Sequence, residues 1–316
     1  MRALTLSLPI LSLPILSLGL TFAMLSGCDG GKADDTAGIT DEADADGDTD
    51  SDTDADTDAE RTLDNCSGSV DSDAPAFFQT YFKCATITYE DGTVTLSILD
   101  LPPHRSPYYD PDSPNYEPFD DRGGTHFQNP NTLSQQAISM DFPMSATAKG
   151  IDIDRLVDQQ AGTSDEEYHS MGTPGMNLDG TAMFHGVAAP GDLLSEERYT
   201  FDTWEGHPQN TGVYHHHSAN PAALAVLEKI GAVSSAVPGE AEIEVYGVMC
   251  DGTVLLGCTE LDGSAPSGDV DAQGGHVHDI TDADGTTHFT DRYHTHMCDG
   301  FYGYAPEIAY YNTRCL

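Results

Sequence analysis

The sequence is poor in basic residues: Lys and Arg together number 12 of 316, against 53 Asp and Glu, and the formal net charge is −41. A nucleic-acid-binding protein needs a basic surface that neutralises phosphates, so this balance excludes that class. The G-x-S-x-G elbow of serine hydrolases and the H-E-x-x-H helix of zinc proteases are also missing. With 38% hydrophobic residues, 31 Gly and 18 Pro, the composition indicates an acidic, turn-rich globular protein.

The amino-terminal segment combines Arg2, an apolar run over residues 4–25, and the sequence Leu25-Ser26-Gly27-Cys28. It resembles a bacterial lipoprotein signal peptide with its lipobox, which implies cleavage before Cys28 and acylation of that residue. A single membrane-spanning anchor is the alternative, but Pro9 and Pro14 interrupt the run. We therefore expect residues 1–27 to be removed and the protein to be held by lipid on a membrane of the bacterial cell envelope, facing the periplasm or the exterior.

Residues 28–61 form a predicted acidic tether, because acids alternate there with small residues and large apolar side chains are almost absent. Such a segment cannot bury enough surface to fold. Its middle resembles the start of an EF-hand calcium loop, but Thr53 stands where a bidentate Glu is needed, which favours a spacer. The predicted folded domain, residues 62–316, still holds 39 acids against nine basic residues, a balance that suits cation binding.

Six cysteines remain after Cys28, and an even number in an exported chain predicts disulfides. No two of the six have C-x-x-C spacing, which disfavours a zinc cluster of cysteines. Cys66 and Cys84 are alone in the amino-terminal half and are predicted to pair. The turn Asp251-Gly252 predicts a hairpin with Val245 opposite Cys258. Three pairings stay open for the remaining four cysteines, which are Cys250, Cys258, Cys298 and Cys315.

The body of the chain reads mainly as strands. Residues 86–99 alternate around Asp91-Gly92, as in a β-hairpin. One helix is predicted after Asn220, a good N-cap, with Pro221 at its first position and Gly231 beyond its end. The predicted fold class is mainly β, with two pseudo-repeated units in one sandwich-like domain and this short helix as the connector.

The two units, at about 175–217 and 247–296, share an ordered set of motifs. Each contains an Asp-Gly-Thr, then an Asp five residues before a Gly-His histidine, then a closing Tyr-His-x-His. Preservation of that order favours an internal duplication. The first unit has Asp179-Gly180-Thr181, Asp202, Gly206-His207 and Tyr214-His215-His216-His217; the second has Asp251-Gly252-Thr253, Asp271, Gly275-His276 and Tyr293-His294-Thr295-His296.

These motifs resemble the YHYH-domain proteins, named for a Tyr-His-Tyr-His sequence, and the resemblance covers most of residues 84–300. Further segments in the family's order are Leu101-Pro102-Pro103-His104, Asn129-Pro130-Asn131-Thr132, Leu178-Asp179-Gly180 and the helix after Asn220-Pro221. The middle tyrosine of the motif is replaced by His216 and Thr295. The resemblance implies a domain with a histidine-rich site rather than a particular reaction.

The histidines themselves indicate metal chemistry. Residues i and i+2 of a strand point to one face, so three pairs of imidazoles are predicted, whereas His216 points away from its neighbours. Neutral imidazole suits copper, zinc, nickel or iron. Two facing pairs would make one shared site, and two separate sites are the alternative. The predicted ligands are His207, His215, His217, His276, His278, His294 and His296, with Asp202 and Asp271 as ligands or as acceptors of a ligand histidine's N–H.

The predicted function is therefore a membrane-anchored, extracytoplasmic protein that binds copper or zinc. A metal-dependent extracellular enzyme, a hydrolase or an oxidoreductase, is the first alternative, with Asp202, Asp271 or Glu205 as a general base. A metal-free cell-surface interaction module is the second.

Overall fold

A computed structural model describes residues 59–145, 159–160, 173–188, 192–271 and 273–298. The chain divides into two compact units, residues 1–53 and 54–316, and every described residue belongs to the second. The predicted signal peptide, Cys28 and the tether up to residue 58 lie outside the described residues. Among the described helices, none combines the length and the apolar character that a membrane span requires.

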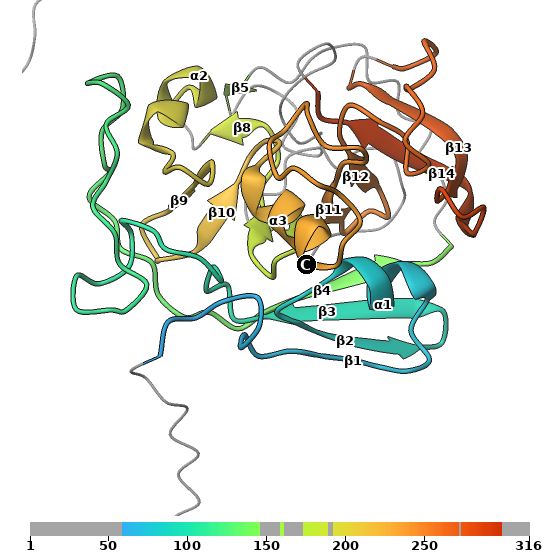
Figure 1. The fold of residues 1–316 in the computed structure, drawn as a ribbon, viewed down its shortest axis with the longest axis horizontal. Helices are drawn as coiled ribbons and strands as arrows, with labels where there is room; N and C mark the ends of the chain where they lie inside the picture. Colours follow the sequence, from blue (N-terminus) through green and yellow to red (C-terminus); the bar gives the residue numbers. More distant parts are fainter. Residues whose placement is uncertain (1–58, 146–158, 161–172, 189–191, 272, 299–316) are drawn as a thin grey trace, which may run out of the picture. The chain divides into compact units, whose positions relative to one another are not determined.

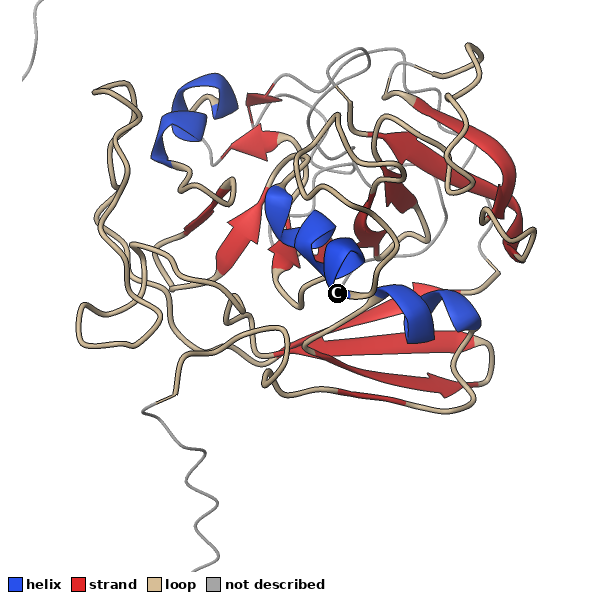
Figure 2. Cartoon of the chain, in the orientation of Figure 1, coloured by secondary structure: helices blue, strands red, loops and turns tan. Residues whose placement is uncertain are grey.

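The described chain is mainly β, with few and short helices (Figure 2). Its largest sheet has eight strands, and its order places the two histidine-rich hairpins at opposite edges (Figure 1). From one edge to the other, the strands are β13 (Gly275–Thr281), β14 (Thr287–His296), β12 (Val254–Leu256), β11 (Val245–Met249), β6 (Gly175–Asn177), β7 (Ala182–Met183), β10 (Tyr214–His216) and β9 (Gly206–Pro208).

A second sheet has four strands: β1 (Ser69–Val70), β2 (Ala85–Glu90), β3 (Thr93–Ile98) and β4 (Ile138–Pro143). The hairpin predicted around Asp91-Gly92 is confirmed as β2 and β3. Both turn residues have positive φ, 50° and 82°, the backbone that a tight two-residue hairpin turn needs. A third pair joins β5 (Gln159–Gln160) to β8 (Val187–Ala188).

Three α-helices and one 3-10 helix complete the described elements: α1 (Ala76–Tyr81), α2 (Leu194–Glu197), η1 (Arg198–Thr200) and α3 (Pro221–Lys229). The predicted helix is confirmed as α3, since the side chain of Asn220 accepts the Ala223 N–H at 2.9 Å and Gly231 has φ 78°. Five of its nine residues are buried. It is therefore part of the core and not merely a connector.

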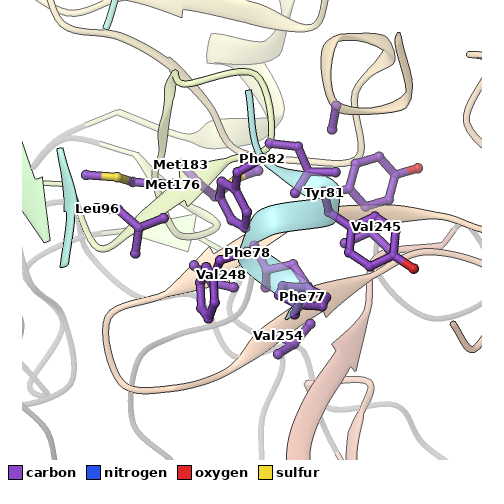
Figure 3. Close-up of a cluster of buried hydrophobic side chains, with 14 of the residues drawn as sticks. Phe77, Phe78, Tyr81, Phe82, Leu96, Met176, Met183, Val245, Val248 and Val254 are labelled. Carbon is purple, nitrogen blue, oxygen red and sulfur yellow. The ribbon is translucent and has the colours of Figure 1, made fainter. Parts of the chain in front are cut away.

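One hydrophobic core draws on both large sheets and on α1 and α3. In Figure 3, Phe77 and Phe78 of α1 point among side chains of the eight-stranded sheet, including Val248 and Val254. The Phe78 ring also lies 5.3 Å from that of Phe142 on β4, and Phe77 lies 5.1 Å from Phe289 on β14. The strands that carry the histidines are consequently anchored in a packed interior.

The Cys66–Cys84 disulfide is confirmed, and Cys258 pairs with Cys298. Cys250 is also disulfide-bonded, and Cys315 lies outside the described residues. The predicted hairpin register is wrong, because Val245 lies opposite Leu256 instead of Cys258. The turn closes with the Met249 N–H on the Thr253 carbonyl, and a β-bulge between residues 245 and 247 shifts the pairing further.

The two halves of the eight-stranded sheet match in detail. Residue 215 pairs with 207 across β10 and β9, as 294 pairs with 276 across β14 and β13. Strand β10 runs parallel to β7, as β14 runs parallel to β12. The two Asp-Gly-Thr turns close with equivalent backbone bonds, residue 177 to 181 at 2.9 Å and residue 249 to 253 at 2.8 Å. These matches support an internal duplication, which itself stays a prediction.

Candidate metal centres

Among the described residues, three groups of side chains have ligand atoms close enough together to hold a metal ion. The first, called here the His215 cluster, consists of His207, His215 and His217. The second, called the His294 cluster, consists of Glu260, His276, His294 and His296. The third is formed by Asp269, His276 and His278. No group among these residues combines the two Tyr-His-x-His motifs, so the two motifs form separate clusters in place of a shared one.

The Gly-His and Tyr-His-x-His motifs have a common structural logic. The ring of Tyr214 lies directly against Gly206, where a Cβ would clash with it, and Tyr293 lies against Gly275 in the same way. Each tyrosine hydroxyl donates to the repeat aspartate, Tyr214 to Asp202 at 2.9 Å and Tyr293 to Asp271 at 2.8 Å. The glycine thus permits a close approach that sets the register of the histidine-bearing strands.

In the His215 cluster the three Nε2 atoms converge. Nε2 of His215 lies 3.1 Å from Nε2 of His207 and 3.0 Å from Nε2 of His217. His207 on β9 faces His215 on β10 across the antiparallel pair, and His217 follows two residues later on the same face. All three side chains are buried.

The other ring nitrogens decide which tautomer each histidine adopts. Nδ1 of His215 lies 3.1 Å from the Val213 carbonyl, and Nδ1 of His217 lies 2.8 Å from the His185 carbonyl. A carbonyl only accepts, so both Nδ1 atoms carry the proton. Nδ1 of His207 lies 2.6 Å from Thr200 Oγ1, whose own proton goes to the Glu197 carbonyl. The three Nε2 atoms therefore present lone pairs to one another, an arrangement that a cation would stabilise.

Burial keeps these rings neutral. It lowers the pKa of His217 to about 3, and burial together with the neighbouring histidines lowers the pKa of His207 and His215 well below the ordinary value. Phe184 stacks on His215 at 3.9 Å between ring centroids, and Phe201 lies edge-on to His207 at 4.8 Å. Neutral imidazole is the form that binds transition metals.

A carboxylate that the sequence did not single out lies beside this cluster. Oε1 of Glu197, the last residue of α2, is 3.6 Å from Nε2 of His207. Its Oε2 is buried and has no hydrogen-bond partner among the described residues. Burial and the nearby charge of Asp192 raise the pKa of Glu197 to about 7. Glu197 therefore lies beside one ligand of the cluster, although its carboxylate is not among the ligand atoms that converge.

The His294 cluster repeats the arrangement on the other half of the sheet. Nε2 of His276 lies 3.1 Å from Nε2 of His296. The Glu260 carboxylate sits among the rings, with Oε1 at 3.2 Å from His276 Nε2 and Oε2 at 3.1 Å from His294 Nε2. Two of the Nδ1 atoms again face carbonyls, His294 towards Arg292 at 3.0 Å and His296 towards Gly257 at 2.9 Å. Their Nε2 atoms point inward to the Glu260 carboxylate, which only accepts, so each of these two rings faces an acceptor at both nitrogens.

The charge of Glu260 distinguishes this cluster from the first. Burial opposes ionisation of Glu260, but hydrogen bonds from the three histidines outweigh it and hold its pKa well below the ordinary value. For His276, burial lowers the pKa, whereas hydrogen bonds to Glu260 and Asp269 raise it, and the net shift is upward. The His294 cluster therefore carries a formal negative charge at its centre, which favours a divalent cation.

Asp202 and Asp271 do not have the predicted role. Asp202 accepts hydrogen bonds from Ser106 Oγ at 2.6 Å, from Tyr214 and from backbone N–H groups of its own turn. Asp271 likewise accepts from the Gln273 and Gly275 N–H groups and from Tyr293. Neither belongs to a candidate metal group, and the ligand histidines donate to carbonyls, Thr200 or Asp269 in their place. Each aspartate stays inside its turn because its carboxylate accepts hydrogen bonds from several donors there at once.

Two further histidines were assigned by strand alternation. His216 lies outside both clusters, as predicted, and its Nδ1 lies 3.0 Å from the Glu205 carbonyl. His278 contacts Asp269 and stacks on His276 at 4.3 Å between ring centroids, but it is not part of the His294 cluster. Glu205, considered as a general base, instead pairs with Arg122 at 2.8 Å.

Both carboxylates of the clusters were missed by sequence reasoning. Glu260 lies two residues after Cys258 and Glu197 lies in a short helix, so neither has a fixed spacing to a histidine. One signal was available: each precedes the repeat aspartate of its own half.

Comparison of the chain with protein-family models, with curated proteins and with solved structures found no match.

Proposed function

We propose that this protein binds two transition-metal ions, copper or zinc, one at the His215 cluster and one at the His294 cluster. The observation that carries the proposal is the direction of the ring nitrogens. In each cluster the Nδ1 protons are taken up by neighbouring acceptors, and Nε2 atoms about 3 Å apart face one another. In the His215 cluster, such convergence of lone pairs in a buried place is costly without a cation, and in the His294 cluster the same nitrogens surround a carboxylate.

The donor set supports copper or zinc over calcium or magnesium. Three imidazole nitrogens, joined in the His294 cluster by one carboxylate oxygen, are typical of zinc and copper sites, whereas the hard cations prefer oxygen ligands alone. Carbonyl acceptors behind the ligand rings are the usual second layer of such sites. The proposed setting, a lipid-anchored protein on the outside of a bacterial membrane, follows from residues 1–61 of the sequence.

Elemental analysis tests the proposal. The chain, purified from a periplasmic or native source without a histidine tag, should contain two equivalents of copper or zinc. The double variant His215→Ala with His217→Ala should lose one equivalent, and the double variant His294→Ala with His296→Ala should lose the other. The control Asp202→Asn should keep both equivalents, because Asp202 is not a ligand in either cluster. A wild-type protein that binds no copper or zinc at micromolar concentrations would contradict the proposal.

A metal-dependent hydrolase is a second candidate, and Glu197 alone favours it. A carboxylate with a pKa near neutrality beside a three-histidine metal ion is suited to accept a proton from metal-bound water. The measurement is ester or peptide hydrolysis by the zinc-loaded protein. Hydrolysis that disappears in Glu197→Gln while zinc is retained would establish this role, and its absence in the wild type would leave metal binding as the function.

A further inference from the structure

The His215 and His294 clusters differ in the side chains that lie next to their ligand histidines. Next to the His294 cluster, Asp269 Oδ1 lies 3.2 Å from His276 Nδ1, and Asp269 Oδ2 lies 3.4 Å from His278 Nε2. His276 thus belongs to two groups at once: its Nε2 faces Glu260, and its Nδ1 faces Asp269. One imidazole ring separates the buried ligand set from a second set of ligand atoms.

This second set reaches the surface. The side chains of Asp269 and His278 are 66% and 40% exposed, whereas that of His276 is 3% exposed. The rings of His276 and His278 stack at an angle of 26°, so their ligand edges lie along the same side of β13. An ion in solution can reach Asp269 and His278 directly, whereas the side chains of His294 and His296 in the buried cluster are 0% exposed.

The chemistry of the exposed set matches that of the buried one. A carboxylate oxygen and two imidazole nitrogens bind zinc or copper, with water in the remaining positions. An ion held by fewer protein ligands is held more weakly and leaves more readily. The two sets share one ring, so an ion that moves from the exposed set to the buried set passes from a weaker site to a stronger one.

The His215 cluster has no such set among the described residues. The outer nitrogen of His207 faces Thr200, which is buried, and the residue two positions after His207 is Gln209 and not a histidine. The two halves therefore share their inner ligands and differ at this outer edge.

We propose that Asp269, His278 and the outer nitrogen of His276 form a capture site that takes the metal ion from solution and delivers it to the His294 cluster. This inference rests on the proposed metal-binding function. An ion on Nδ1 of His276 would leave the single ring proton on Nε2, which faces Glu260, and an ion on Nε2 would leave it on Nδ1, which faces Asp269. The neutral ring has one proton in either state, so no net proton is gained or lost.

Cobalt(II) loading of the full-length chain in detergent tests the delivery, because four-coordinate cobalt is coloured. In a His215→Ala, His217→Ala background only the His294 cluster remains to load. Adding His278→Ala should slow loading about tenfold or more, the scale on which local attraction raises association rates. The cobalt held by the His294 cluster at equilibrium should not change, because His278 is not a ligand of that cluster. The control is His126→Ala, a partly exposed histidine outside all three groups.

A His278→Ala variant that loads as fast as its parent would overturn the capture site, even if the wild type binds a further equivalent of cobalt there. The background variant is not needed if it folds poorly, since His278→Ala in the otherwise wild-type chain should slow one of two loading phases and leave the other unchanged. Absence of bound cobalt, together with absence of bound zinc and copper at equilibrium, would instead contradict the proposed function itself.

Discussion

Removing the metal should lower the thermal stability of this protein in two separable steps. Each cluster brings three imidazole rings together, and Nε2 of His215 lies 3.0 and 3.1 Å from the two neighbouring Nε2 atoms of its cluster. A bound ion converts the repulsion between these atoms into coordination. It binds the folded state, whose ligands converge, far better than the unfolded chain, and so it stabilises the fold.

The size of the effect follows from linkage. At a free metal concentration one hundred times the dissociation constant, each site adds about 2.7 kcal/mol to the free energy of unfolding. For a domain of this size, about 1 kcal/mol corresponds to about 2–4 °C in Tm, so each site should contribute about 5–11 °C. The two sites lie on opposite edges of one sheet and share no ligand, so their contributions should add.

Differential scanning calorimetry with intact disulfides measures this directly. Zinc-loaded wild type should lose both increments on addition of a strong chelator, and each double-alanine variant should lose only one. Reloading with zinc should restore the Tm, which separates metal loss from irreversible unfolding. A wild-type Tm that responds neither to chelator nor to added zinc or copper would refute the reasoning from the converging nitrogens.

Three other perturbations have defined outcomes. Asn220→Ala removes the N-cap of α3 and should cost about 1–2 kcal/mol in urea unfolding. Burial lowers the pKa of His104 to about 4, so the folded state binds fewer protons than the unfolded chain between pH 6.5 and 4. About 3 kcal/mol of folding stability should therefore be present above pH 6.5 and be lost as the pH falls to 4. The variant His104→Phe should flatten this dependence of stability on pH. The double variant Cys258→Ser, Cys298→Ser should weaken metal binding at the His294 cluster about tenfold or more in chelator competition and spare the other cluster, because the disulfide lies two residues from ligands on both chain segments.

Local features of this protein were predictable because they depend on neighbouring residues alone. The Asp91-Gly92 hairpin needs two positive φ values, and those residues tolerate them at low cost. Asn220 reaches an N–H only three residues away, so its cap requires no tertiary contact. The pairing of histidines at i and i+2 follows from strand alternation, which placed the ring pairs on one face and left His216 apart.

The ligand sets were decided by the tertiary structure. Whether the two motifs met in one site or in two depended on strand order, and the central β6 and β11 separate them. Glu197 and Glu260 come from outside the histidine strands, and only chain packing brings their carboxylates to the rings.

The sequence by itself determined the acidic composition of this chain, the even number of cysteines after Cys28 and the residue types available to a metal, and it predicts an exported protein. Tertiary structure alone decided which nitrogens converge, which carboxylates join them, and which aspartates are consumed by turns. The physical reason is that coordination depends on distances of a few ångströms between residues far apart in the chain, and only the packed sheet sets those distances.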